Sequence, residues 1–181
     1  GLALGKELTR RGASVVLADR DGDEAEKHAS ELRSSGCQAM GVTLDVTDPV
    51  AVESIVNKVA ADQGRLDYIF NNAGIGVGGE AAYYELSDWT RVIDVNLMGV
   101  VYGVHSAYAI MRRQGFGHII NTASMAGLLP APSVLSYTTT KHAVVGLSRA
   151  LRIEAEQYGV RVSVLCPGVI RTPIIEGGKY G

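Results

Sequence analysis

A tyrosine and a lysine one helical turn apart are the residues of this 181-residue chain best suited to move a proton. Tyr137 and Lys141 lie at the start of a predicted helix, and their i, i+4 spacing places both side chains on one face. A phenol ordinarily titrates near pH 10, so it works as a base near neutral pH only where a cation stabilises the phenolate. The ammonium of Lys141 is such a cation, although the same spacing also suits an ordinary exposed helix face.

Ser124 and Asn96 are two further polar residues at informative places. Ser124 follows a predicted strand over residues 118–122, and ligands of open α/β sheets bind at the carboxyl ends of strands. Its hydroxyl could hold a substrate carbonyl oxygen or simply belong to a turn, and the absence of a Gly-x-Ser-x-Gly elbow argues against a hydrolase. Asn96 falls inside a long apolar helix, which indicates a kink, a bound water or a solvent-facing side chain.

Two glycine-containing segments could bind a dinucleotide. Gly1 opens a predicted helix over residues 2–11, and Asp19 ends the following strand, where a carboxylate can accept both hydroxyls of an adenosine ribose. The Gly-x-Gly-x-x-Gly run over residues 74–79 matches the dinucleotide fingerprint by its letters. However, the next helix is expected to begin only near Ser87, so no helix N-terminus would meet the phosphates there. We therefore expect the cofactor near Gly1 and Asp19.

The elements that must position these residues alternate between apolar strands and amphipathic helices. We expect strands over residues 14–19, 39–44, 66–70, 118–122 and 160–165, with helices over residues 2–11, 23–34, 87–113 and 136–157 and another beginning at Pro49. This order is typical of an α/β protein with a doubly wound parallel sheet, the three-layer α/β/α Rossmann fold. Because its first strand precedes the first helix, we expect residues 1–181 to be a single Rossmann domain truncated at both ends.

Composition excludes several classes of protein. Seventeen Lys and Arg against nineteen Asp and Glu give a net charge of −2, which offers no argument for binding nucleic acid or an anionic membrane. Hydrophobic residues make up 46% of the chain, enough for a buried core. The two cysteines, Cys37 and Cys166, suit a reducing compartment and predict a cytoplasmic protein without a disulfide scaffold. The four histidines show no ligand spacing, so we expect no metal site.

Taken together, these pieces resemble the short, single-domain subunits of the short-chain dehydrogenase/reductase family over essentially the whole chain. Gly1 is similar to the last glycine of the family's Thr-Gly-x-x-x-Gly-x-Gly loop, and residues 71–74 match its Asn-Asn-Ala-Gly motif. The residues that match the family's catalytic tetrad, in order and spacing, are Asn96, Ser124, Tyr137 and Lys141. The remaining matches are Asp45 and Val46, beside the adenine, and Pro167, Gly168 and Thr172, which hold the nicotinamide carboxamide.

The resemblance implies hydride transfer between a nicotinamide and a carbinol or carbonyl carbon. Tyr137 would be the general base or acid, Lys141 would stabilise its phenolate and bind the nicotinamide ribose, and Ser124 would bond the substrate oxygen. Asn96 would hold a water that links Lys141 to solvent. The implied cofactor-binding residues are Gly1, Asp19, Arg20, Asp45, Val46, Asn72, Ala73, Gly74, Tyr137, Lys141, Pro167, Gly168, Ile170 and Thr172, and the implied substrate-binding residues are Ser124, Met125 and Tyr137.

Individual residues favour one cofactor and one class of substrate. Asp19 favours NAD(H) because its carboxylate would repel a 2′-phosphate, whereas Arg20 directly after it could bind one and make NADP possible. Met125, Leu128 and Leu129 indicate an apolar lining, so the expected substrate is a secondary alcohol or ketone with an apolar body. Three alternatives stay open: an NADPH-dependent carbonyl or 3-oxoacyl-thioester reductase, a catalytically silent dinucleotide sensor, and an extended-family epimerase or dehydratase, which would need a C-terminal substrate domain.

The long helix also suggests a partner. From Asn96 to Met111 the sequence contains no Asp, Glu, Lys or Arg, and a helix that is apolar on most sides needs cover beyond one sheet face. Tyr102, Tyr108 and Met111 suit a subunit interface. The family resemblance agrees, since its dimers and tetramers pack this helix and the one bearing Tyr137 against their mates, and we expect a homodimer or homotetramer.

Overall fold

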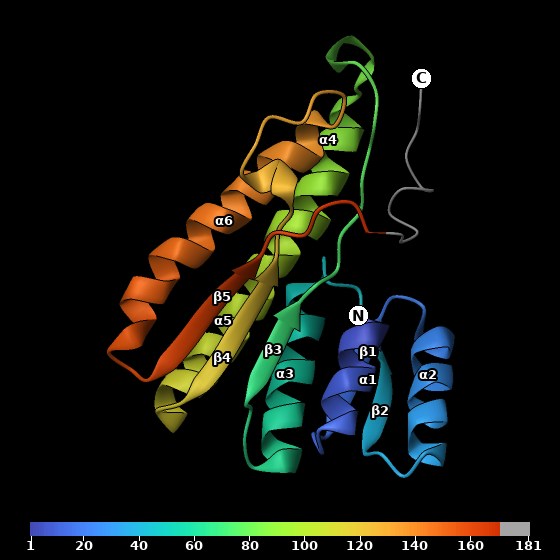
Figure 1. Ribbon diagram of the computed structural model, residues 1–181, viewed down its shortest axis with the longest axis vertical. Helices are drawn as coiled ribbons and strands as arrows, with labels where there is room; N and C mark the ends of the chain where they lie inside the picture. The colour runs from blue at the N-terminus through green and yellow to red at the C-terminus, as the bar shows by residue number, and fades with distance from the viewer. Residues whose placement is uncertain (171–181) are drawn as a thin grey trace.

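The computed structural model describes residues 1–170 of the chain (Figure 1). Helices and strands alternate along it, as the sequence predicts. In chain order, the elements are α1 (Leu2–Arg10), β1 (Val15–Asp19), α2 (Gly22–Ser34), β2 (Ala39–Thr43), α3 (Pro49–Gln63), β3 (Tyr68–Asn71), η1 (Ala81–Tyr83), α4 (Leu86–Ile93), η2 (Asp94–Met98), α5 (Gly99–Gln114), β4 (Gly117–Thr122), η3 (Met125–Gly127), α6 (Leu135–Glu156) and β5 (Val160–Leu165).

Side-chain caps mark where α3 and α4 begin. The Asp48 side chain accepts hydrogen bonds from the backbone N–H groups of Val50 and Ala51, with Pro49 at the first helical position. For α4 the expectation of a start near Ser87 is wrong by one or two residues. Glu85 is the N-cap, and Asp88 returns a bond by accepting the Glu85 N–H at 3.2 Å, since acidic residues three apart can cap a helix reciprocally.

The strands are all parallel but form two sheets. β1 pairs with β2, and β3, β4 and β5 pair in that order, with Ile69 opposite Ile119 and Ile119 opposite Val162. Within residues 1–170, β1 and β3 do not pair with each other. In Figure 1, α3, α5 and α6 lie behind the strands and α1 lies in front of β1 and β2, so helices cover opposite faces as in a Rossmann fold.

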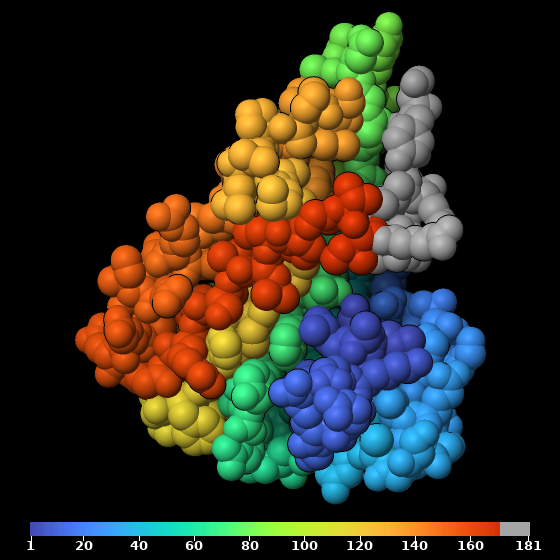
Figure 2. Space-filling model, viewed as in Figure 1, coloured from blue at the N-terminus to red at the C-terminus, as the bar shows by residue number. Residues whose placement is uncertain are grey.

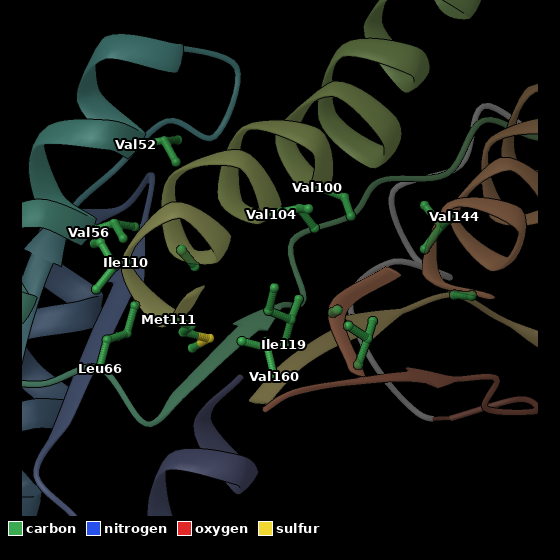
Figure 3. Packing of buried hydrophobic residues seen from close by; sticks show 14 of the residues in the cluster. Val52, Val56, Leu66, Val100, Val104, Ile110, Met111, Ile119, Val144 and Val160 are labelled. Carbon is green, nitrogen blue, oxygen red and sulfur yellow. The ribbon is translucent and has the colours of Figure 1, made fainter. Parts of the chain in front are cut away.

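The hydrophobic core lies between the three-stranded sheet and helices α3, α5 and α6 (Figure 3). β-Branched residues on the strands meet residues spaced three, four and seven apart on the helices. One expectation is corrected here. Met111 is fully buried beside Gly117, because its position on α5 faces the sheet, and it does not take part in a surface interface. The labelled core residues in Figure 3 are Val52, Val56, Leu66, Val100, Val104, Ile110, Met111, Ile119, Val144 and Val160.

The long helix predicted around Asn96 is interrupted where that residue lies. A π-helical turn, η2, separates α4 from α5, and Asn96 within it is fully buried. The alternative of a solvent-facing asparagine is therefore wrong, and the expected local distortion is present. Turns of this kind insert one extra residue and are frequent at functional sites. No helix within residues 1–170 is both long and apolar enough to cross a membrane.

Candidate active site

The carboxyl ends of β3, β4 and β5 bring distant parts of the chain together. Just beyond β4, the Ala123 N–H donates to Leu165 O at 2.7 Å and the Met125 N–H donates to Pro167 O at 2.9 Å. On the other side, the Thr122 hydroxyl donates to Asn72 Oδ1 at 3.2 Å. Figure 2 shows the segment after β4 against the segment after β5 at this end of the molecule. The parallel strands thus bring the Asn-Asn-Ala-Gly loop, the segment that contains Ser124 and the segment that contains Pro167 together at one edge of the sheet.

Lys141 and Tyr137 lie on the same face of α6. The Lys141 ammonium nitrogen is 5.4 Å from the centre of the Tyr137 ring. The lysine is 2% exposed, and Nζ donates to the carbonyl oxygen of Thr122 at 2.9 Å. Burial penalises the charged form and lowers the pKa of Lys141 from its usual 10.5 to about 8. The structure thus places a cation beside the phenol, at the end of β4.

Asn96 faces the same place from the π-helical turn. Its Oδ1 accepts the Ile75 N–H at 2.8 Å, and its Nδ2 donates to Ile75 O at 2.9 Å. The side-chain amide therefore binds both backbone polar groups of one residue in the loop after β3. Gly74 lies between the catalytic candidates. A Cβ there would lie 3.4 Å from Asn96 Oδ1 and 3.5 Å from Lys141 Nζ. Both distances are ordinary van der Waals contacts, so the two polar groups lie directly against the loop at Gly74.

Ser124 caps the short turn η3, which packs on α6. Its backbone is extended, and its Oγ accepts the Ala126 N–H at 3.2 Å. A Cβ at Gly127 would lie 2.7 Å from the backbone oxygen of Lys141, so only a glycine lets the turn approach α6 this closely. Within residues 1–170, no hydrogen bond joins Ser124 to Tyr137. The serine hydroxyl keeps its own proton to donate, because its bond to Ala126 uses only a lone pair.

The residues expected at the adenosine end lie beyond β1 and β2. Asp19 is exposed, and its Oδ1 accepts the Asp21 N–H at 3.0 Å. Asp45 accepts both the backbone N–H and the hydroxyl of Thr47, at 2.9 and 2.7 Å, and these bonds lower its pKa below the ordinary value, with a smaller contribution from the charge of Arg20. Two carboxylates and one guanidinium thus meet at the ends of these strands.

A hollow of about 480 Å³ lies at the same end, lined by Arg20, Asp21, Gly22, Asp23 and Thr43. Val46 packs against Gly99, where an added Cβ would lie 2.9 Å from Val46 Cγ2. Gly1, at the start of α1, lies beside Asn72, since a Cβ on Gly1 would be 3.9 Å from Asn72 Nδ2. The start of α1 therefore lies beside the loop after β3, and a helix N-terminus is a place where backbone N–H groups can bind a phosphate.

The structure gives the remaining candidates no side-chain hydrogen-bond partner within residues 1–170. Ala73, Gly168 and Ile170 are exposed, and Thr172 lies outside the described residues. The Gly-x-Gly-x-x-Gly run over residues 74–79 is a loop that opens no helix, as expected from the sequence. Within the described part of the chain, no group of three or more His, Cys, Asp or Glu residues is arranged to hold a metal ion.

Comparison with known proteins identifies the chain. A family model described as short chain dehydrogenase matches residues 1–178. The chain belongs to the short chain dehydrogenase family. One relative, the 1-deoxy-11-beta-hydroxypentalenate dehydrogenase of Streptomyces exfoliatus, is 38% identical over 181 residues, which cover 98% of this chain and 66% of the relative. The family expected from the motifs is confirmed.

Two solved structures share the fold of this short chain dehydrogenase. A short chain dehydrogenase/reductase from Burkholderia phymatum, in complex with NAD, is 37% identical with a TM-score of 0.92 and is covered over 63% of its length by 96% of this chain. A gluconate 5-dehydrogenase from Burkholderia cenocepacia, in complex with NADP and tartrate, is 30% identical with a TM-score of 0.90, covering 96% of this chain and 69% of that one. The chain spans about two thirds of the length of these proteins.

A buried polar network lies behind the site, and of its three residues the sequence singles out only Asn71, as part of the Asn-Asn-Ala-Gly motif. Asn71 Nδ2 donates to Asn121 Oδ1 at 2.8 Å, and Asn121 Nδ2 donates to the Ser148 hydroxyl at 2.9 Å. Gly103 on α5 makes room for Asn71, whose Oδ1 would clash with any Cβ there. The one available signal is spacing: Ser148 follows Lys141 by seven residues, which places both on the same face of α6. The network fixes α6 to β4 two turns below the lysine.

Replacing the buried lysine should stabilise the fold at neutral pH. Below about pH 8 both the folded and the unfolded chain carry the Lys141 proton, so the folded state bears the whole cost of burying the charge. The interval from 10.5 down to about 8 corresponds to roughly 3 kcal/mol, so Lys141→Met should raise the free energy of unfolding at pH 7 by up to that amount. Urea unfolding followed by circular dichroism measures it.

The pH dependence gives this prediction its sign. Between about pH 8 and 10.5 the unfolded chain binds a proton that the folded chain does not, so the native protein becomes more stable as the pH rises and the advantage of Lys141→Met shrinks. Lys58→Met, at an exposed lysine of α3 paired with Asp62, is the matched control and should show no such trend. A Lys141→Met variant that is less stable at pH 7, or whose advantage is constant up to pH 10, would contradict the prediction.

Proposed function

We propose that this protein is an oxidoreductase that transfers a hydride between NAD(H) and a secondary alcohol or ketone with an apolar body. The observation that carries the proposal is the buried Lys141 ammonium 5.4 Å from the Tyr137 ring, at the carboxyl ends of parallel strands. The residues present fit the cofactor. The start of α1 lies beside Asn72, Arg20 lines a hollow at the ends of β1 and β2, and Asp19 precedes Arg20 as the last residue of β1.

Tyr137 and Lys141 would move the proton. Nicotinamide, when bound, accepts or supplies the hydride. In alcohol oxidation the Tyr137 phenolate takes the proton of the substrate hydroxyl, and in carbonyl reduction the phenol returns it. Lys141 stabilises the phenolate through its charge. Within residues 1–170, Thr122 accepts from one of the three N–H donors of Lys141, and the other two would bind a ribose and a water.

Ser124 and Asn96 would support that proton transfer. The Ser124 hydroxyl, whose proton is not used by the turn it caps, would donate to the substrate oxygen and hold the reacting carbon in place. Both ends of the Asn96 amide already bind Ile75. The water that links Lys141 to solvent is therefore expected on the backbone of the π-helical turn rather than on the Asn96 side chain.

The apolar body of the substrate is proposed from the loop between β4 and α6. Leu128 and Leu129 are 52% and 53% exposed and Met125 is 43% exposed, in the same segment as Ser124. Several large apolar side chains exposed together beside polar catalytic groups are typical of a binding site for an apolar ligand. The 1-deoxy-11-beta-hydroxypentalenate dehydrogenase of Streptomyces exfoliatus is named for a hydroxylated compound, which agrees with this substrate class.

The NADPH-dependent reductase is the second candidate function, and one observation favours it. Arg20 lines the hollow next to Asp19, and the gluconate 5-dehydrogenase with a similar fold was crystallised with NADP. A guanidinium is the side chain best suited to bind a ribose phosphate. The carboxylate of Asp19 in the same place supports NAD(H) as the first choice.

We also propose that the enzyme works in the cytoplasm. Cys37 and Cys166 are both free thiols, which a reducing compartment preserves. A fractionation of the source cells followed by immunodetection tests this, and recovery with secreted proteins would overturn it.

Removing the phenol hydroxyl should abolish turnover while sparing cofactor binding. Tyr137→Phe deletes the group that takes and returns the proton, so the turnover number should fall by about 10²–10⁴-fold. The assay is NADH formation or consumption with a panel of cyclic and long-chain secondary alcohols and ketones, and NADH binding is measured by calorimetry. Tyr68→Phe is the matched control and should keep full activity, because Tyr68 begins β3 and the candidate site lies beyond the carboxyl end of that strand. A Tyr137→Phe enzyme that retains turnover would refute the proposal.

Removing the carboxylate at the end of β1 should shift the cofactor preference. Asp19→Ala eliminates the repulsion of a 2′-phosphate, so the ratio of kcat/KM for NADPH to that for NADH should rise by about tenfold or more. Adding Arg20→Ala should reverse much of the gain, because Arg20 is the cation next to that position. Initial rates with both cofactors decide this, and an unchanged ratio in Asp19→Ala counts against the assignment of Asp19.

We propose that the protein forms a homodimer or homotetramer through α5 and α6. Ile153 on α6 is 79% exposed, and a Cβ on the exposed Gly146 two turns earlier would meet no atom within 4 Å. An apolar residue and a glycine on one outer helix face allow close approach of a second helix. On α5, the other helix of the proposed interface, Tyr102 and Tyr108 are half-buried.

Sedimentation velocity at micromolar concentration should therefore show a dimer or tetramer. Ile153→Glu places a charge on the proposed contact face and should shift the distribution toward the monomer, whereas Val50→Glu, at an exposed valine of α3, should leave it unchanged. A monomeric native protein at these concentrations would overturn the proposed assembly.

A further inference from the structure

Three consecutive threonines separate Tyr137 from Lys141, and the structure gives them different environments. Thr139 is exposed and Thr138 is half-buried, whereas Thr140 is fully buried. A buried hydroxyl requires partners, because leaving a polar group unpaired in the interior is costly. Thr140 has two of them, and they belong to two different parts of the site.

Thr140 joins the π-helical turn to the backbone of Tyr137. Its hydroxyl donates to the carbonyl oxygen of Tyr137 at 2.8 Å and accepts from Asn96 Nδ2 at 3.4 Å. The other Nδ2 proton of Asn96 goes to Ile75 O. A continuous set of hydrogen bonds therefore leads from the loop after β3, through Asn96 and Thr140, to the residue that bears the phenol.

We propose that Thr140 is a positioning residue that holds Tyr137 in register with Asn96 and Lys141. This inference rests on the proposed function, because it assigns Thr140 a part in the same proton transfer. Thr140 touches neither substrate nor cofactor in this assignment. It acts by fixing how the first turn of α6 is seated on the π-helical turn.

A threonine bonded to a carbonyl three residues earlier is common in helices and by itself indicates nothing. Thr9 on α1 makes bonds of this kind to Gly5 and Lys6, far from any site. What distinguishes Thr140 is its second bond, across to Asn96 of another element, with both residues fully buried. Without the hydroxyl, one Nδ2 proton of Asn96 has no partner within residues 1–170, and the hydrogen bond between α6 and the π-helical turn is lost. A displacement of a catalytic group by a fraction of an ångström is enough to slow a reaction.

Two variants separate positioning from packing. Thr140→Val keeps the volume and removes the hydroxyl, while Thr140→Ser keeps the hydroxyl and removes a methyl group. Thr140→Val should lower kcat by at least about tenfold with the KM for NADH changed by less than about twofold, and Thr140→Ser should recover most of the loss. Thr139→Val, the same change one residue away on the exposed face, is the matched control and should behave like the native enzyme.

A measurement without turnover keeps this test independent of the proposed function. The side-chain amide protons of Asn96, assigned by ¹⁵N-asparagine labelling with Asn96→Ala as reference, should exchange slowly in the native protein and in Thr140→Ser. In Thr140→Val one of the two should exchange at least about tenfold faster. If no substrate of the panel is turned over, the proposed function fails and this exchange still decides whether Thr140 holds Asn96.

Three results would overturn the inference. They are a Thr140→Val enzyme with native kcat, a loss in Thr140→Val that Thr140→Ser shares in full, and Asn96 exchange that Thr140→Val does not alter. If Thr140→Val fails to unfold cooperatively, Thr140→Ala replaces it in the comparison with Thr140→Ser. An unchanged Asn96 exchange rate in that variant would be equally decisive against the proposal.

Discussion

The constraint on which the site depends is the burial of one ammonium group. Lys141 is 2% exposed, and Thr122 supplies the one hydrogen bond to it from within residues 1–170. Water would solvate this charge far better, so the fold must hold the lysine in place through its surroundings. The loop after β3 lies against the lysine at Gly74, and Gly127 lets the turn after β4 pack closely on α6, because any side chain there would strike the backbone of Lys141.

The packing of α6 on the sheet explains how the fold keeps the charged lysine buried. At Lys141 the helix touches the end of β4 through the Thr122 carbonyl, and two turns later Ser148 meets the neighbouring strand residue, Asn121. Two consecutive residues of one strand thus fix the helix at two points, and Asn71 extends the second bond to β3. Apolar contacts such as those of Val144 are non-directional, so they leave the helix free to slide slightly. Buried hydrogen bonds at two heights remove that freedom.

Sequence reasoning succeeded where a short-range rule has a single outcome. The cap at Asp48 with Pro49 follows from local geometry, and the shared face of Tyr137 and Lys141 follows from the helical period. It failed where the partner comes from a distant segment. Met111 shows the same apolar pattern whether it faces the sheet or a second subunit, and only the fold decides that it is buried. Likewise, the residues around Asn96 in the sequence do not predict that Ile75 lies beside it.

The polar residues that sequence reasoning missed share a physical explanation. Asn121 and Thr140 lie in segments whose sequence is typical of an ordinary strand and an ordinary helix. Each can be fully buried because a neighbouring element supplies a hydrogen-bond partner for its side chain. Such groups add little net stability, since each bond replaces one to water, but they penalise any packing that leaves them unpaired. The end of α6 that bears Tyr137 and Lys141 is therefore positioned less by attraction than by the cost of every packing that leaves these groups unpaired. That requirement is what an active site needs, because the reaction tolerates far less displacement than the fold does.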